Sequence, residues 1–419
     1  MQFRVETFLN QYLSPGATRA DAVFSLSAQG GGEATPVRRV VGLIADKSGS
    51  MDGDKIAALK HALRVAVDEM DGDVEAFVMA FDFVPKLLLP PTMMTMDGRR
   101  AAHQAIQRVE AGGGTVMSAA LAGARQLFEQ RPGALCQAIM LTDGQNDVND
   151  EKALGVALES CAGVFQADCR GVGTDWSPGQ LRMIAGRLLG TVQLVAGPAD
   201  MARDFRETMA AAMSKSVSGV RLRLWMPKNA RLVSVKQAFP TEIDLTSQVR
   251  PVDARAVDVP VGAWGEGTQD YFATFELTPL GVGEQMLVCR PSVVWGEAVT
   301  AGTTAAGGNV TVTWTDDAGL TTRIDAQVAH YTGQAEKAQA IQQGLEAMER
   351  QDDAAATMLL GRALVLAEQA GDVETTMRLR AVVEGDAAGG TLRIRRGAGK
   401  VATMDLDVAS TRTVRAKRD

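Results

Sequence analysis

Short apolar runs alternate with amphipathic stretches between about Arg38 and Ser214. The runs Val40 to Ala45, Val74 to Phe81 and Leu135 to Leu141 contain at most one charged residue each, as expected of strands buried on both faces. From Asp54 to Met70, apolar residues recur at spacings of three and four, which is typical of a helix with one buried face. This alternation predicts an α/β fold with a doubly wound, mainly parallel sheet.

Further segments of the same two kinds complete a sheet of six strands. We expect strands at Val164 to Val172 and Thr191 to Val195, a short edge strand at Val84 to Leu89, and helices at Arg99 to Val109, after Gly114, at Glu151 to Cys161, at Pro178 to Leu189 and at Ala199 to Met213. Proline lacks the amide donor that a ladder needs, so we expect Pro90-Pro91 to end the edge strand.

The segments on either side of this unit alternate apolar and polar residues with a period of two. Ala22 to Ser27 is one such run, and a glycine-rich hinge, Gln29 to Glu33, follows it. Six similar runs come after the unit: Val220 to Trp225, Leu232 to Val235, Val257 to Val261, Tyr271 to Leu277, Gln285 to Cys289 and Asn309 to Trp314. We expect an all-β antiparallel sandwich that also takes in the N-terminal strand, with the α/β unit inserted into it.

The C-terminal part differs again in composition. From about Gln334 to Glu384 it is rich in Ala, Gln, Glu, Met and Leu and lacks proline, which predicts a helical hairpin or three-helix unit. A basic tail, Gly389 to Asp419, ends the sequence. We therefore divide the chain into an N-terminal segment (1–35), an α/β domain (36–216), a β-sandwich (217–328), a small helical unit (329–388) and the tail (389–419).

Overall charge indicates which partners to expect, and the cysteines indicate the redox state of the chain. With 43 Lys and Arg against 50 Asp and Glu, the chain is mildly acidic, so we expect neither nucleic acid nor a membrane as a partner, although the tail suits an acidic one. The four cysteines lie far apart, and we expect them to be reduced and buried. Residues Met1 to Gly16 do not have the pattern of a secretory leader; with Met1 as the true start, we expect a cytoplasmic protein.

Oxygen-bearing side chains gather at the ends of the predicted strands. Asp46, Ser48 and Ser50 follow the first apolar run, Thr115 follows three glycines, and Asp143 follows a later run. Open α/β sheets bind ligands at the carboxyl ends of their strands, where these segments meet. Carboxylate and hydroxyl oxygens suit Mg²⁺, Mn²⁺ or Ca²⁺, whereas zinc favours His and Cys, which are lacking nearby. The sequence therefore predicts one divalent cation site made from these residues.

This arrangement resembles the metal-ion-dependent adhesion site of von Willebrand factor type A (vWA) domains, and the resemblance covers roughly residues 38–214. It implies a Mg²⁺-type ion bound directly by Ser48 and Ser50, with the two aspartates and the threonine completing the shell directly or through water. One position is left for a carboxylate of a partner protein. Similar bacterial cytoplasmic proteins often serve in multi-protein assemblies, including stress and metal-resistance systems, so the resemblance implies a binding module and not an enzyme.

Several of these residues also have simpler interpretations. Ser50 or Asp52 suits the cap of the first helix, and the three glycines suit a flexible turn. We expect Lys47 to face solvent, with a charge able to tune ion affinity. Asp147 and Asp150 are expected to be loop acids or helix caps and not ligands.

Two other functions stay open at this stage. In a Mg²⁺-dependent hydrolase, Asp46 would be the nucleophile, but Ser48 stands where a phosphotransferase of the haloacid-dehalogenase type has a second acid. In a metal-independent scaffold, partners would bind the helical unit and the tail. A nucleotide-binding function is disfavoured, because no glycine-rich phosphate loop follows the first strand.

Overall fold

The computed structural model describes residues 1–30, 37–296, 303–385, 392–395 and 397–416. The chain forms two compact units. One comprises Gly31–Gly219 and Gly262–Gly265, and the other comprises Met1–Gly30, Val220–Val261 and Glu266–Asp419. Residues 31–33 of the predicted hinge lie outside the described part of the chain. Within that part, no helix has both the length and the apolar character needed to cross a membrane.

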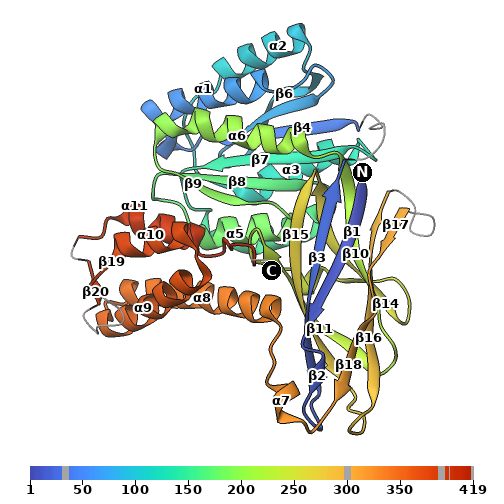
Figure 1. Cartoon of the computed structure of the whole chain (residues 1–419). Coiled ribbons are helices and arrows are strands. Elements are labelled where there is room, and N and C mark those ends of the chain that lie inside the picture. Colours follow the sequence, from blue (N-terminus) through green and yellow to red (C-terminus); the bar gives the residue numbers. More distant parts are fainter. Residues whose placement is uncertain (31–36, 297–302, 386–391, 396, 417–419) are drawn as a thin grey trace. The chain divides into compact units, whose positions relative to one another are not determined.

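The first unit is built on a six-stranded sheet with the order β6-β5-β4-β7-β8-β9 (Figure 1). Its strands are β4 (Arg39–Asp46), β5 (Glu75–Phe81), β6 (Pro85–Met93), β7 (Leu135–Thr142), β8 (Gln166–Val172) and β9 (Val192–Val195). Neighbouring strands are parallel except for β5 and β6. The predicted α/β fold with a mainly parallel sheet is thus confirmed.

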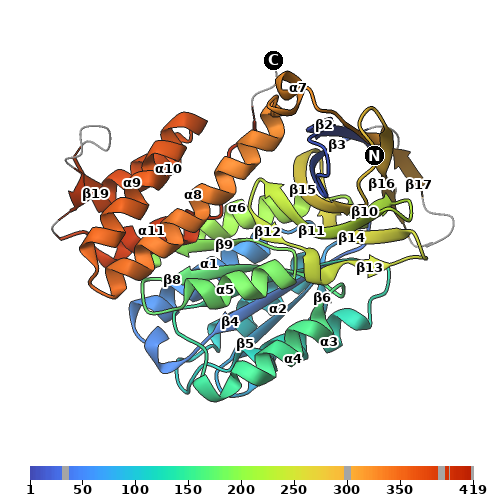
Figure 2. The ribbon, with the colours of Figure 1, turned by 90° about the horizontal axis from the view of Figure 1, so that it is seen from below.

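Helices cover both faces of this sheet (Figure 2). They are α1 (Asp54–Asp68), α2 (Met96–Gln107), α3 (Met117–Glu129), α4 (Glu151–Cys161), α5 (Pro178–Arg187) and α6 (Met201–Ser214). On one face, Leu63 of α1, Ile106 of α2 and Phe205 of α6 join one apolar core. Alternate residues of a strand face opposite sides, and on the other face the ring of Phe77 lies 5.1 Å from that of Phe128 in α3.

The edge strand β6 is longer than expected. It continues through Pro90 and Pro91 to Met93, so the prediction that the prolines end it was wrong. Its pairing with β5 passes from Leu89 directly to Thr92, and both prolines fall in this irregularity. Both prolines lie outside the paired residues, and an edge strand tolerates a missing amide donor better than a central strand does.

The second unit contains two sheets, one with the order β1-β3-β15-β11-β12 and the other with the order β13-β14-β10-β16-β18-β2, with β17 paired to β16. The strands are β1 (Gln2–Leu9), β2 (Tyr12–Leu13), β3 (Arg19–Gln29), β10 (Val217–Trp225), β11 (Ala230–Phe239), β12 (Ile243–Asp244), β13 (Arg250–Pro251), β14 (Ala256–Trp264), β15 (Gly267–Leu277), β16 (Gln285–Trp295), β17 (Thr303–Ala306) and β18 (Val310–Trp314). Among the described ladders of these two sheets, only the short pair β2 and β18 is parallel, which the antiparallel prediction missed.

The N-terminal strand belongs to these sheets. The run expected near Val23 is β3, which pairs antiparallel with β15. The two sheets contact each other through Phe3 of β1 and Trp295 of β16, whose ring centroids are 4.7 Å apart. Each of the six runs expected after the α/β unit corresponds to a strand, usually a longer one.

The helical part extends beyond the expected boundary. Its helices are α7 (Ala318–Thr321), α8 (Ala326–Glu349), α9 (Asp353–Ala370), α10 (Val373–Val382) and α11 (Lys400–Ala409), and a small hairpin joins β19 (Val383–Glu384) to β20 (Arg393–Ile394). Helix α11 lies in the segment interpreted as a basic tail. Leu406 of α11 shares an apolar core with Ile341 of α8, Leu364 of α9 and Leu379 of α10. We therefore correct the three-helix unit to a four-helix core that includes part of the tail.

Candidate metal centre

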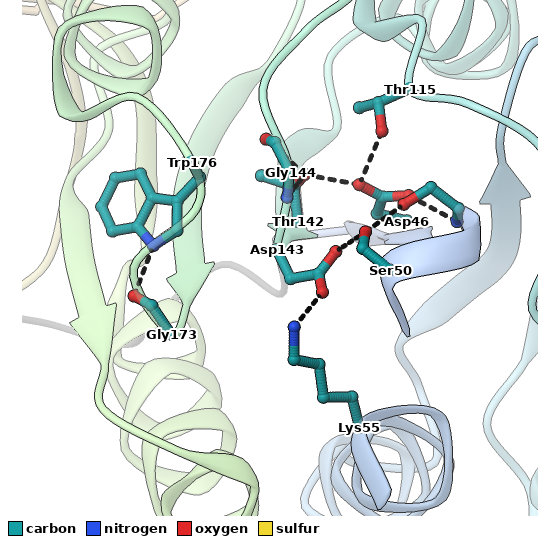
Figure 3. Close-up of polar contacts among 10 residues, drawn as sticks. Asp46, Ser50, Lys55, Thr115, Thr142, Asp143, Gly144, Gly173 and Trp176 are labelled. Atoms are coloured by element: carbon teal, nitrogen blue, oxygen red, sulfur yellow. Dashed lines mark hydrogen bonds and ion pairs between the residues drawn. The ribbon is translucent and has the colours of Figure 1, made fainter. Parts of the chain in front are cut away.

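Three loops at the carboxyl edge of the sheet bring the predicted ligands together (Figure 3). Asp46 is the last residue of β4, and Ser48 and Ser50 lie in the turn that follows. Thr115 lies just before α3, and Asp143 directly follows β7. Because β4 and β7 are adjacent and parallel, both strands deliver their carboxylates to the same edge.

Asp46 is the fully buried centre of this cluster. Its Oδ1 accepts a hydrogen bond of 2.8 Å from the amide of Ser48, and its Oδ2 accepts one of 2.5 Å from the hydroxyl of Thr142. The hydroxyl of Thr115 lies 3.4 Å from the same Oδ2. Two loops therefore hold the carboxylate in one orientation. The role of Thr142 was not foreseen, although a threonine directly before the strand-end aspartate is a usable signal.

The two serines link Asp46 to Asp143. The hydroxyls of Ser48 and Ser50 are 3.1 Å apart, and that of Ser50 donates to Asp143 Oδ1 at 2.6 Å. The other oxygen of Asp143 pairs with Lys55 of α1 at 2.5 Å. The five predicted residues thus form one connected set, and Lys55 joins it from a helix that sequence reasoning assigned no part in the site.

The helix-cap interpretation of the first loop does not fit the structure. The N-cap of α1 is Gly53, and no side chain caps this helix. Ser50 faces Asp143 instead, and Asp52 bonds the neighbouring amide of Gly53. The Asp-x-Ser-x-Ser turn therefore has no capping role that would account for its residues.

The glycine segment before Thr115 is anchored to the first loop. The amide of Gly49 donates to Gly113 at 3.0 Å, and the amide of Gly112 donates to Lys47 at 2.7 Å. Gly113 has φ of 87°, a conformation that other residues rarely adopt. A Cβ on Gly114 would lie 2.5 Å from the ring of Phe83. The glycines are therefore needed for a close backbone approach, and they hold Thr115 beside the other ligands.

The remaining charged residues nearby have structural partners. Lys47 was expected to face solvent, but its side chain is only 18% exposed and pairs with Asp82. Asp147 accepts from the amide of Asn149 at 2.8 Å. Asp150 accepts from the amide of Ser118 at 3.0 Å, at the start of α3. Both aspartates thus serve as caps, as expected, and neither joins the ligand cluster.

The electrostatics of the cluster suit a divalent cation. Burial raises the pKa of Asp46, hydrogen bonds from Thr142 and Ser48 oppose this effect, and the nearby Asp143 adds to it. Among the described residues, Lys55 forms an ion pair with Asp143, but no cationic side chain pairs with Asp46. A buried carboxylate without a counter-charge is costly, and a hard cation among two carboxylates and three hydroxyls would remove that cost.

Other metal chemistry is not supported in the described part of the chain. No group of three or more His, Cys, Asp and Glu side chains is placed there to hold a metal ion. In the neighbouring loop after β8, the indole of Trp176 donates to the carbonyl of Gly173 at 3.0 Å and supplies no ligand (Figure 3). The four cysteines are buried free thiols, and burial raises the pKa of Cys136, Cys161 and Cys169 to about 11, 11 and 12.

Exposed apolar side chains lie in two loops that contact the segment carrying Thr115. Phe83, whose ring lies against Gly114, is 58% exposed. Val148 is 86% exposed, and the amide of its neighbour Asp147 donates to the carbonyl of Thr115 at 2.8 Å. Both loops that carry these side chains are therefore tied to the segment that presents Thr115. The surface around the cluster offers apolar contacts as well as oxygen ligands.

Comparisons with known proteins identify the domain family. A model described as von Willebrand factor type A domain matches residues 41–145, and one described as von Willebrand factor type A C-terminal domain matches residues 365–410, across the boundary between the predicted helical unit and tail. A solved structure titled von Willebrand factor type A from Catenulispora acidiphila is 39% identical, with a TM-score of 0.93, over 99% of this chain and 97% of that one. The ArnB paralog VWA2 from Sulfolobus acidocaldarius has a TM-score of 0.62 at 15% identity, over 98% of each chain.

Two curated proteins share part of the sequence. The uncharacterized protein sll0103 of Synechocystis sp. is 27% identical over 211 residues, which are 49% of this chain and 50% of that protein. The E3 ubiquitin-protein ligase WAV3 of Arabidopsis thaliana is 31% identical over 144 residues, 32% of this chain and 19% of that protein. The matches thus span half or less of the length of these curated relatives.

Proposed function

This chain belongs to the von Willebrand factor type A family, and we propose that it is a metal-dependent protein-interaction module. In the proposal, Asp46, Ser48, Ser50, Thr115 and Asp143 hold one divalent cation. Mg²⁺ is the preferred ion, and Mn²⁺ and Ca²⁺ suit the same oxygens. The ion supplies an open position for a carboxylate of the partner protein.

The observation that carries the proposal is the convergence of four oxygen-bearing side chains, those of Ser48, Ser50, Thr115 and Asp143, on the buried and uncompensated carboxylate of Asp46. Three hydroxyls bring no charge, so two aspartates neutralise a divalent ion without surplus. The bound ion then still attracts an anionic ligand from outside. The residues of this chain orient the ion, and the partner supplies the remaining ligand.

The apolar side chains beside the site indicate what kind of partner fits. Phe83 and Val148 are exposed, and the loops that carry them both contact the segment that presents Thr115. A protein segment with one acidic residue between apolar residues would cover both side chains while its carboxylate reached the ion. A small anion would leave them in water, so a protein partner is the better match.

A binding role is better supported than hydrolysis. Asp46 is buried, and each of its oxygens accepts a hydrogen bond from this chain, which does not suit a nucleophile. In the described part of the chain, Asp46 has hydrogen-bond partners in Ser48, Thr115 and Thr142, and none of these is a histidine, carboxylate or thiolate that could act as a general base. We therefore propose that the chain is not an enzyme.

A metal-independent scaffold is the second candidate, and one observation favours it. Met358 of α9 and Val373 and Met377 of α10 are exposed apolar side chains on helices that pack together. Such a surface suits a second protein contact. It would work without a metal ion, which separates this candidate from the first.

The proposal extends to cellular context. It places the chain in the cytoplasm, supported by its four buried free thiols. We also propose that the chain acts in a bacterial multi-protein assembly of a stress or metal-resistance system. This part of the proposal rests on the family resemblance.

Partner capture with and without a chelator tests the function. The full chain is immobilised, exposed to native lysate in Mg²⁺ or in EDTA, and the retained proteins are identified by mass spectrometry. We expect specific partners to be lost in EDTA and with Asp143→Ala, and to be kept by Asp147→Asn, which removes a nearby charge outside the cluster. Partners that survive EDTA but are lost with a Met358→Ser, Met377→Ser double variant would overturn the metal-dependent role in favour of the scaffold.

A further inference from the structure

Lys55 places a positive charge inside the candidate metal centre. Its Nζ lies 2.5 Å from Asp143 Oδ2, while the other carboxylate oxygen accepts from Ser50 (Figure 3). The side chain of Lys55 is 30% exposed and that of Asp143 is fully covered. The lysine therefore approaches from the outer side of the carboxylate, and it leaves the oxygen next to Ser50 directed into the cluster.

Other lysines nearby do not share this position. Lys47 lies within the Asp-x-Ser-x-Ser motif, but its charge is paired with Asp82. Lys60 lies on the same helix as Lys55 and has no described contact with a ligand residue. In the described part of the chain, Lys55 is thus the cationic side chain paired with a candidate ligand.

We propose that Lys55 is a built-in counter-cation that weakens metal binding and strengthens the binding of the partner's carboxylate. This inference rests on the proposed function. Two aspartates alone neutralise a divalent ion, whereas with Lys55 the loaded site keeps one positive charge. The same charge therefore repels the entering metal ion and attracts the acidic residue of the partner.

The lysine also has a role before metal arrives. Asp143 is buried, and removing its cationic partner leaves an uncompensated charge in the folded chain. Lys55 thus holds the metal-free site in its converged arrangement. Removal of Lys55 is therefore expected to destabilise the metal-free protein and to strengthen metal binding. A simple loss of packing would not produce this combination.

The first test measures metal affinity with Mn²⁺, by electron paramagnetic resonance of the free ion. We expect Lys55→Met to bind Mn²⁺ about tenfold more tightly than the wild type, and Lys55→Arg to stay near it. Lys60→Met is the matched control, because it removes one charge from the same helix, and we expect no comparable gain. In the absence of metal, Lys55→Met should unfold at lower temperature than the wild type, and Mn²⁺ should raise its unfolding temperature more.

The second test measures carboxylate binding to the Mn²⁺-loaded protein, with acetate as the probe and water-proton relaxation as the readout. Acetate that takes the open position displaces a metal-bound water and lowers the relaxation enhancement. We expect Lys55→Met to need several-fold more acetate than the wild type. Equal or weaker Mn²⁺ binding by Lys55→Met, or unchanged acetate binding, overturns the role of Lys55 alone. A wild-type protein that binds no divalent ion overturns the proposed function and this inference with it.

Discussion

The hydroxyl of Ser50 donates to Asp143 across 2.6 Å, and these two residues are 93 positions apart in the chain. This hydrogen bond closes the ligand cluster between the loop after β4 and the loop after β7. The candidate site is therefore largely arranged by the hydrogen bonds of this chain alone. A preorganised site loses little conformational freedom on binding, and individual ligands can be removed without dismantling the sheet beneath them.

Asp46→Ala is expected to abolish Mg²⁺ binding while the chain stays folded. The change removes the central carboxylate, and with it a buried charge whose pKa burial has raised, so the metal-free protein loses little. Calorimetric titration with Mg²⁺ measures the first effect, and circular dichroism measures the second. Asp147→Asn is the control and should bind as the wild type does. Equal Mg²⁺ affinity in Asp46→Ala would falsify the site assignment.

Phe83→Ser and Val148→Ser are expected to weaken partner capture in Mg²⁺ but to leave metal affinity unchanged. Both side chains are exposed beside the cluster and supply no oxygen ligand. Truncating an apolar contact at the centre of an interface typically costs about 1 to 2 kcal/mol, or roughly tenfold in affinity. Val156→Ser is the control, because Val156 is an exposed apolar residue of α4. Capture by Phe83→Ser and Val148→Ser equal to that of the wild type would show that the partner does not cover these two side chains.

Gly113→Ala is expected to destabilise the first unit by about 1 to 3 kcal/mol and to weaken Mg²⁺ binding. Gly113 has φ of 87°, and an added Cβ would lie 2.7 Å from Cβ of Asp82, which is paired with Lys47. Gly155→Ala is the contrasting variant, since a Cβ there meets nothing within 4 Å and the residue lies in α4. It should stabilise the protein by about 0.5 to 1 kcal/mol. Denaturant unfolding and Mg²⁺ titration measure both changes.

Lys337→Met is expected to destabilise the helical core by about 3 kcal/mol. Lys337 and Asp372 form a buried ion pair at 2.5 Å, and Lys337 also donates to Gln334 at 2.7 Å. Without Lys337, the buried carboxylate of Asp372 has no cationic partner. Hydrogen exchange of peptides from α8 measures the local effect. The exposed pair of Arg362 with Glu336 is the control, and Arg362→Met should stay within about 1 kcal/mol of the wild type.

The same pair predicts a loss of stability in acid. Burial opposes the charged form of Asp372, but hydrogen bonds from Lys337 and from the amide of Thr375 outweigh this and hold its pKa below the ordinary 3.8. An aspartate with a lowered folded-state pKa contributes stability above its unfolded pKa and loses it as the pH falls through the folded value. Exchange protection of α8 should therefore fall as the pH is lowered below 3.8, the ordinary pKa of an aspartate. The Asp372→Asn variant should lack this loss of protection in acid. The same pH profile in this variant and in the wild type would contradict the prediction.

The convergence of the five oxygen-bearing side chains was predictable from the sequence because all of them except Thr115 follow apolar runs that end as strands, whereas their role as metal ligands stays a prediction. Asp46 and Asp143 each follow an apolar run, and parallel strands bring such residues to one edge. The contact of Lys55 with Asp143 was not predicted. It depends on the reach of a side chain from the first turn of α1 to the loop after β7, which the sequence pattern does not show. Phe83 was missed for a related reason: its place against Gly114 results from the close approach of two loops.

The parts of the fold that sequence reasoning missed share a weak local signal. The apolar residues of α11 are interleaved with charges, and only its packing against α8, α9 and α10 shows that it belongs to their core. The strand β6 passes through two prolines because its partner strand is on one side only. In both cases, packing against or pairing with a neighbouring element determined the secondary structure, although the local sequence favoured another one.

The prolines of β6 also disfavour edge-to-edge pairing between copies of this chain. A free sheet edge offers unpaired amides on which a strand of another copy can be added, and this is a route to aggregation. At Pro90 and Pro91 that edge has no amide hydrogen to offer, and the irregular pairing with β5 twists it locally. A chain that we propose to bind other proteins thus has two positions on one edge of its sheet that cannot donate a hydrogen bond to an added strand.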